Sequence, residues 1–96
     1  MKQTAIPFLQ HENRHEFLDI LGRSCQALGE FEQAISYYKE YLSHYGTNLQ
    51  VLNSIGECYY KVGNKEEALI AWERSLELNP EQERLKNLVQ SIKEKR

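Results

Sequence analysis

The sequence predicts an all-α fold in which antiparallel helix hairpins stack as an α-solenoid of about five helices. Apolar residues recur three and four positions apart, which is the spacing of amphipathic helices. Glycine, asparagine and proline separate these segments. Most tellingly, the same residues recur after a step of 34 positions. The identical pairs are Leu18 and Leu52, Gly22 and Gly56, Gly29 and Gly63, Glu32 and Glu66, Ala34 and Ala68, and Leu42 and Leu76.

The composition fits one small folded domain and excludes several classes of protein. The chain has 96 residues, of which 41% are hydrophobic and 27% charged. A net charge of −2 does not favour nucleic acid, and the apolar runs are too short to span a membrane. Cys25 and Cys58 match no disulfide framework and no metal-binding spacing. Two unpaired thiols fit a reducing compartment, so a cytoplasmic location is expected.

The first hairpin is predicted to span residues 15–48. Its first helix covers residues 15–28, and Gly29 ends that helix by supplying a left-handed cap. Its second helix covers residues 31–45, and Gly46-Thr47-Asn48 breaks it. The apolar positions are Phe17, Leu18, Leu21, Cys25 and Leu28 in the first helix, and Phe31, Ala34, Ile35, Tyr38, Tyr41 and Leu42 in the second.

The second hairpin, residues 49–82, repeats this plan. Its helices cover residues 49–62 and 65–78, with a turn at Gly63-Asn64. Pro80 ends the second helix, because proline cannot continue a helix and disfavours helical geometry in Asn79. The apolar positions are Val51, Leu52, Ile55, Tyr59 and Val62, then Ala68, Leu69, Trp72, Leu76 and Leu78.

The two ends of the chain differ. Residues 1–14 carry apolar Ile6, Phe8 and Leu9 around Pro7, which predicts a short or irregular segment packed on the first hairpin. Residues 83–96 are predicted to form a capping helix, which the apolar spacing places at about residues 81–94. Its apolar stripe is Leu85, Leu88, Val89 and Ile92, on an otherwise polar helix.

Gly22 and Gly56 lie in the middle of predicted helices, where glycine costs about 1 kcal/mol relative to alanine. That cost indicates a close helix crossing at each glycine. Tyr38 and Trp72 are expected to fill the space between hairpins.

These residues resemble the tetratricopeptide repeat family. The second hairpin carries the family pattern at Leu52, Ile55, Gly56, Tyr59, Ala68, Trp72 and Pro80, and the first keeps it at Leu18, Leu21, Gly22, Ala34 and Tyr38. The first hairpin departs from the pattern with Cys25 in place of an aromatic residue and Gly46 in place of proline. The resemblance implies a right-handed superhelix that presents a concave groove to a protein or peptide.

Helical spacing selects the residues that would line this groove, since the first helix of each hairpin faces it. They are Asp19, Arg23, Gln26, Gln50, Asn53, Glu57, Tyr60, Arg84 and Asn87. Asparagine can hold a peptide backbone, arginine a carboxylate, and tyrosine an apolar anchor. Some family members hold the acidic tails of chaperones with a Lys/Asn/Arg clamp. Asp19 and Arg23 replace its first lysine and asparagine, so such a ligand is not expected.

One enzyme-like pattern is present. His11-Glu12-Asn13-Arg14-His15 has the spacing by which two histidines bind zinc and a glutamate acts as base. The longer form of this motif requires glycine at Leu18 and histidine at Leu21. The pattern also lies at the start of the first repeat, without a catalytic domain around it. A zinc-dependent hydrolase is therefore a distant alternative, and no catalytic, cofactor-binding or metal-binding residue is assigned.

The sequence thus predicts a non-catalytic protein-interaction module that binds a protein or peptide, and neither nucleic acid nor membrane. Two hairpins form a small core, whereas such stacks usually need three or more units. We therefore expect either contact with further repeats of a longer chain or self-association. The alternative function is a structural unit that builds homo-oligomers through its exposed ends.

Overall fold

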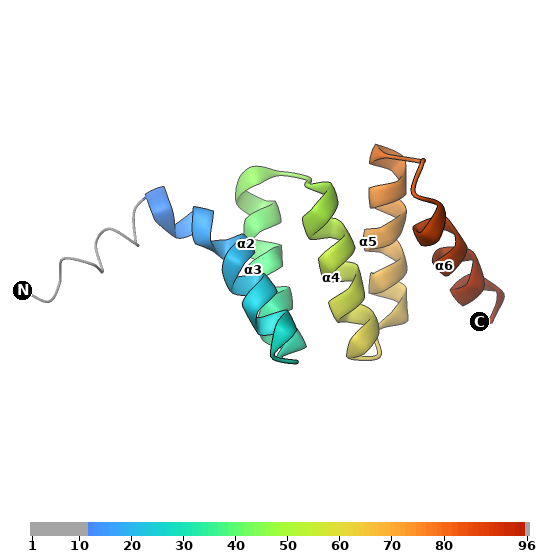
Figure 1. The fold of residues 1–96 in the computed structure, drawn as a ribbon, viewed down its shortest axis with the longest axis horizontal. Helices are drawn as coiled ribbons and strands as arrows, with labels where there is room; N and C mark the ends of the chain where they lie inside the picture. Colours follow the sequence, from blue (N-terminus) through green and yellow to red (C-terminus); the bar gives the residue numbers. More distant parts are fainter. Residues whose placement is uncertain (1–11, 96) are drawn as a thin grey trace, which may run out of the picture.

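The computed structural model describes residues 12–95, with side chains described from Phe17 onward. These residues form five α-helices, which follow one another along the long axis of the molecule in chain order (Figure 1). The stack of antiparallel hairpins predicted from the sequence is confirmed. The helices are α2 (Glu12–Ala27), α3 (Phe31–Tyr45), α4 (Leu49–Lys61), α5 (Lys65–Leu78) and α6 (Glu83–Glu94).

The turn inside each hairpin has the same hydrogen-bonded geometry. Gly29 and Gly63 have positive φ angles of 83° and 90°, in the left-handed region that glycine adopts at no steric cost. The residue after each glycine donates its backbone N–H to the carbonyl five positions back, from Glu30 to Cys25 and from Asn64 to Tyr59, both at 2.8 Å. This pattern satisfies carbonyls at the end of the first helix. The left-handed cap predicted at Gly29 is confirmed.

The hydrophobic core lies between successive units of the stack, in two clusters. The first joins α3 to α4 and also includes Ala71 of α5; the second joins α5 to α6. Each hairpin therefore gains stability by covering its neighbour. The buried members of the first cluster are Ala34, Ile35, Tyr38, Val51, Ile55, Cys58 and Ala71, and those of the second are Ala68, Leu69, Trp72, Val89 and Ile92.

The close approach predicted at the two mid-helix glycines is confirmed, and each involves an aromatic ring of the same hairpin. A Cβ atom on Gly22 would lie 2.5 Å from Cε1 of Tyr38. A Cβ atom on Gly56 would lie 2.4 Å from Nε1 of Trp72. Both rings also belong to the clusters between units, so they fill the gap within a hairpin as well as the predicted gap between hairpins.

Candidate functional site

Side chains of α2, α4 and α6, the first helices of the units, meet on one surface, which we call the first-helix face. Two side-chain hydrogen bonds bridge it. Gln26 Nε2 donates to Glu57 Oε1 between α2 and α4, and Asn53 Nδ2 donates to Gln82 Oε1 between α4 and the start of α6, both at 3.0 Å. The structure therefore brings groove residues predicted from both hairpins onto one surface.

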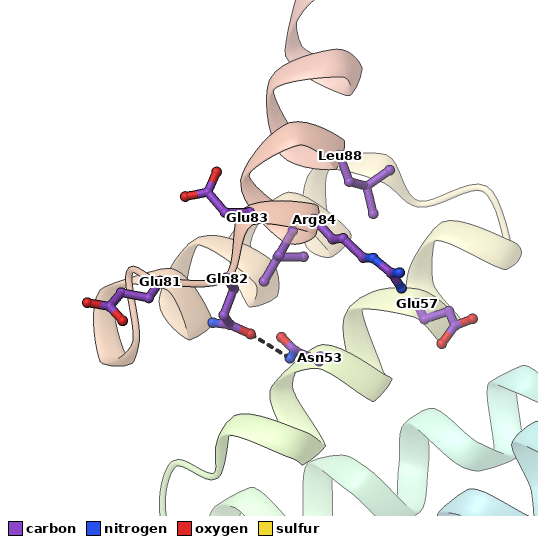
Figure 2. Close-up of a pocket in the computed structure, with 8 residues that line it drawn as sticks. Asn53, Glu57, Glu81, Gln82, Glu83, Arg84 and Leu88 are labelled. Carbon is purple, nitrogen blue, oxygen red and sulfur yellow. Dashed lines mark hydrogen bonds between the residues drawn. The ribbon is translucent and has the colours of Figure 1, made fainter.

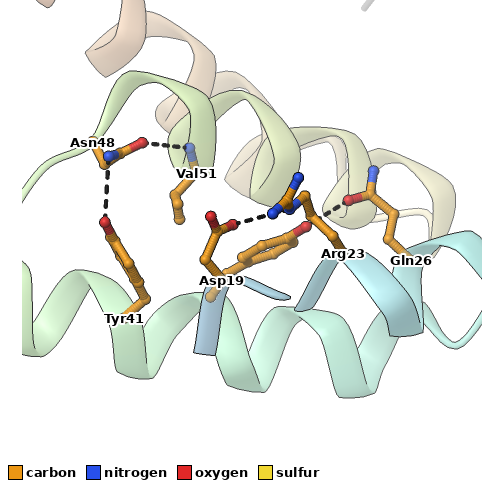
Figure 3. A network of polar contacts seen from close by, with 7 residues as sticks. Asp19, Arg23, Gln26, Tyr41, Asn48 and Val51 are labelled. Carbon is orange, nitrogen blue, oxygen red and sulfur yellow. Dashed lines mark hydrogen bonds and ion pairs between the residues drawn. The ribbon is translucent and has the colours of Figure 1, made fainter. Parts of the chain in front are cut away.

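The part of this face between α2 and α4 is occupied by contacts among the predicted residues themselves (Figure 3). Arg23 Nε lies 3.4 Å from Asp19 Oδ1, one helical turn away. Gln26 Oε1 accepts a hydrogen bond of 2.8 Å from the Tyr38 hydroxyl, while its amide nitrogen donates to Glu57. A partner would have to break these contacts to use the same groups.

The part between α4 and α6 holds an open pocket of about 760 Å³ (Figure 2). Arg84 reaches across it from α6 and forms no ion pair with any residue that the structure describes. Leu85 and Leu88 supply apolar surface beside the guanidinium group. The complete lining is Asn53, Glu57, Glu81, Gln82, Glu83, Arg84, Leu85 and Leu88, of which the sequence predicted Asn53, Glu57 and Arg84.

Asn53 is held in the wall of this pocket by the fold. Its Nδ2 donates a hydrogen bond to Gln82 Oε1, and its backbone carbonyl accepts a 3.2 Å hydrogen bond from Trp72 Nε1. Its Oδ1 is buried without a partner among the described residues. Because this oxygen is buried, the paired hydrogen bonds that the sequence suggested for a peptide backbone require the Asn53 side chain to move first.

Among the five lining residues that sequence reasoning missed, Gln82 makes the most contacts with neighbouring elements. It precedes α6, and its side chain turns back so that Nε2 donates to the carbonyls of Ser75 and Asn79, at 3.2 and 2.9 Å. A glutamine in this position has no recognisable sequence signal, because the contact depends on the path of the chain after Pro80. Gln82 therefore joins the end of α5 to Asn53 in α4.

The remaining predicted residues lie outside this pocket. Tyr60 is half exposed, with its ring 5.9 Å from that of Trp72, and it lines a second pocket of about 440 Å³ with Leu88, Ser91 and Lys95. Gln50 and Asn87 are exposed and line neither of these two pockets. The nine predicted residues thus do not line one pocket: Glu57 links the contacts around Gln26 to the pocket of Arg84, and Tyr60, Gln50 and Asn87 lie outside that pocket.

Tyr38 and Cys58, two groups of the described chain whose pKa values are shifted, belong to the core. Burial raises the pKa of the Tyr38 hydroxyl, despite a hydrogen bond to Ser54 that opposes the shift. Burial, followed by the charge of Glu57, raises the pKa of the Cys58 thiol to about 11. Because Cys58 is protonated near neutral pH and fully buried, it does not have the properties of a nucleophilic cysteine.

The zinc-binding pattern at residues 11–15 falls largely outside what the structure describes. His11 lies beyond the described residues, and the side chains of Glu12 and His15 are also not described. Elsewhere, residues 17–95 contain no group of three His, Cys, Asp or Glu side chains that is suited to hold a metal ion. Within the described part of the chain, no helix has both the length and the apolar character needed to cross a membrane.

Stacked hairpins, a repeat of 34 residues and matched glycine–aromatic contacts define a helical repeat protein of the solenoid class. Residues 18–48 and residues 50–82 each match the tetratricopeptide repeat family, so the chain belongs to this family. Tetratricopeptide repeats generally bind proteins or peptides. No curated protein matches the chain.

Proposed function

We propose that this chain is a non-catalytic module that binds a peptide or protein segment on its first-helix face, at the pocket between α4 and α6. The observation that carries the proposal is an unpaired guanidinium, Arg84, beside exposed apolar surface of Leu88 in an open pocket. A charged group combined with an apolar contact in a concave site is the usual arrangement for ligand recognition. The two free thiols, Cys25 and Cys58, support a role in a reducing compartment such as the cytoplasm.

Each lining group has a distinct role in the proposed site. The guanidinium of Arg84 binds a carboxylate or a backbone carbonyl of the ligand, since arginine offers several donors in a planar fork. Leu85 and Leu88 contact an apolar side chain of the ligand. Glu57 keeps one carboxylate oxygen for the ligand, because Gln26 donates only to Oε1.

The carboxylates around the pocket argue against a strongly acidic ligand. Glu57, Glu81 and Glu83 contribute three carboxylates to the lining, against the single guanidinium of Arg84. Like charges placed opposite each other oppose binding, so a ligand with several carboxylates is disfavoured. This agrees with the departures from the chaperone-tail clamp at Asp19 and Arg23.

The test compares two exposed arginines. Peptides selected from a random display library on the wild-type chain are titrated against wild type, Arg84→Ala and Arg74→Ala. Arg74 is an exposed residue of α5 that lines neither pocket, so it is the matched control. We expect Arg84→Ala to weaken binding at least about tenfold, the loss expected for one hydrogen-bonded charge, and Arg74→Ala to leave it unchanged. Equal affinity for both variants would exclude the pocket as the binding site.

A further inference from the structure

The 34-residue repeat aligns one face of the first hairpin with faces that are buried in the following units. The units are the first hairpin, the second hairpin and α6. We call this surface the leading face: it is the side of each unit that is directed towards the preceding unit. It is apolar in all three units except at Ser24 of the first hairpin. Its aligned positions are Phe17, Val51 and Leu85; Leu21, Ile55 and Val89; and Ser24, Cys58 and Ile92.

In the second hairpin and in α6, the second helix of the preceding hairpin covers the leading face. Ile55 is 3% exposed because α3 packs on it, and Val89 is 5% exposed because α5 packs on it. The covering residues share one spacing, with large apolar groups at positions i, i+3 and i+7. They are Ile35, Tyr38 and Leu42 in α3, and Leu69, Trp72 and Leu76 in α5.

In the first hairpin the same face lies open among the described residues. Leu21 is 39% exposed, although the aligned Ile55 and Val89 are buried. Within the described chain, α2 contacts only α3 and α4, and Leu21 belongs to neither of the two buried clusters. Leu28 provides a comparison. It is 75% exposed, but the aligned Val62 is also exposed at 41%, so that position is never covered. Leu21 is therefore more exposed than Ile55 and Val89 because no described helix covers it as α3 and α5 cover them.

We propose that the leading face of the first hairpin binds an amphipathic helix of a separate protein, with apolar residues at i and i+7 and an aromatic residue at i+3. The two internal copies of this contact define both the position and the chemistry of the ligand helix. This surface is separate from the pocket that contains Arg84, so both sites can be occupied together.

Two other occupants fit less well. A second copy of this chain offers no free helix of this kind among its described residues, because α3 and α5 already cover α4 and α6. Residues 1–11 include Ile6, Phe8 and Leu9, but Pro7 prevents an uninterrupted helix with the required spacing. The expectation that residues 1–14 pack on the first hairpin stays a prediction, and the experiment below distinguishes it.

The chain itself supplies a probe for this surface. A fluorescent peptide of residues 30–46 contains α3, which covers the leading face of the second hairpin. Its anisotropy is measured against wild type, Leu21→Asp and the matched control Leu28→Asp. We expect saturable binding to wild type and to Leu28→Asp. We expect Leu21→Asp to weaken binding at least about tenfold, since the contact would bury an unpaired carboxylate. A peptide with Ile35→Asp is expected to bind weakly to all three.

Circular dichroism first establishes that both variants are folded. We expect them to fold because Leu21 and Leu28 are both exposed in the wild type. Absence of saturable binding to wild type, or equal binding to Leu21→Asp and Leu28→Asp, overturns the proposal. Binding that appears only after Phe8 and Leu9 are both changed to aspartate assigns the face to residues 1–11 instead. A wild-type dimer in sedimentation that Leu21→Asp dissociates assigns it to a second copy. Either result refutes a separate partner helix.

Discussion

Each hairpin holds an aromatic ring of its second helix against a glycine of its first. The pairs are Gly22 with Tyr38 and Gly56 with Trp72. Any side chain on the glycine would occupy space that the ring already fills, since a contact below 3.0 Å requires something to move. Glycine is retained in mid-helix because the ring contact outweighs its low helix propensity.

Replacing Gly56 with alanine is expected to destabilise the protein, although alanine favours helices. The gain in helix propensity is about 1 kcal/mol. Against this, crowding against the indole of Trp72 costs typically 1–3 kcal/mol and more where backbone must shift. We expect a net loss of about 1–2 kcal/mol in urea denaturation. In a Trp72→Leu background the same change should cost less or stabilise. A more stable Gly56→Ala protein in the wild-type background would disprove the crowding.

The buried thiol of Cys58 should make stability depend on alkaline pH. Its pKa is raised from 9.0 to about 11 by burial, so the folded state keeps the proton that the unfolded state releases. The associated stability is complete below pH 9.0 and is lost as pH rises to about 11. Two pH units correspond to about 3 kcal/mol at most. We expect Cys58→Ala to lose less stability than wild type between these pH values in urea titrations. Identical losses would refute the assignment to Cys58.

At the scale of the helices, the sequence predicted α3 and α5 with their observed bounds, because strong turn residues flank both. It placed the start of the first helix at residue 15, whereas α2 begins at Glu12. The repeat register suggested residue 15, but residues 12–14 contain neither glycine nor proline, so the helix extends backwards. It placed the last helix from about residue 81, whereas α6 begins at Glu83, because Asn79 Oδ1 accepts the N–H of Glu81 in a turn.

Exposure along the predicted apolar stripes was harder to foresee. Leu78 and Leu88 belong to predicted stripes but are about half exposed, at the end of α5 and on the side of α6 that faces the pocket. Helical spacing identifies which residues share a face. It does not reveal where the neighbouring helix stops covering that face.

Among the described helices, the last helix contacts α5, so it should open separately. Val89 and Ile92 are buried against α5, and Lys93 forms an ion pair with Glu73. Truncating Ile92 to alanine should cost about 2–5 kcal/mol. We expect hydrogen exchange in Ile92→Ala to increase throughout α6 while α3 stays protected. Lys93→Ala is the control, because an exposed ion pair contributes about 0–1 kcal/mol. Equal acceleration of exchange in α3 and α6 would show that the two helices open together.

For the whole molecule, the 34-residue repeat predicted the architecture because matched residues are packing residues. The same register placed Asn53, Glu57 and Arg84 around one pocket. It did not predict that Asp19, Arg23 and Gln26 would be engaged by other side chains. Those contacts depend on side-chain conformations and on distances between helices, which a one-dimensional pattern does not contain.

The order of the helices also has a kinetic consequence. From α2 to α6, every pair of helices in contact is adjacent along the chain, apart from the α2–α4 pair, which skips one helix. Almost all contacting helices are therefore joined by short loops, so bringing them together costs little loop-closure entropy. Proteins of such low contact order fold in roughly microseconds to milliseconds. Either hairpin can start the process, and the stack then grows by adding the helix next to the part that is already folded.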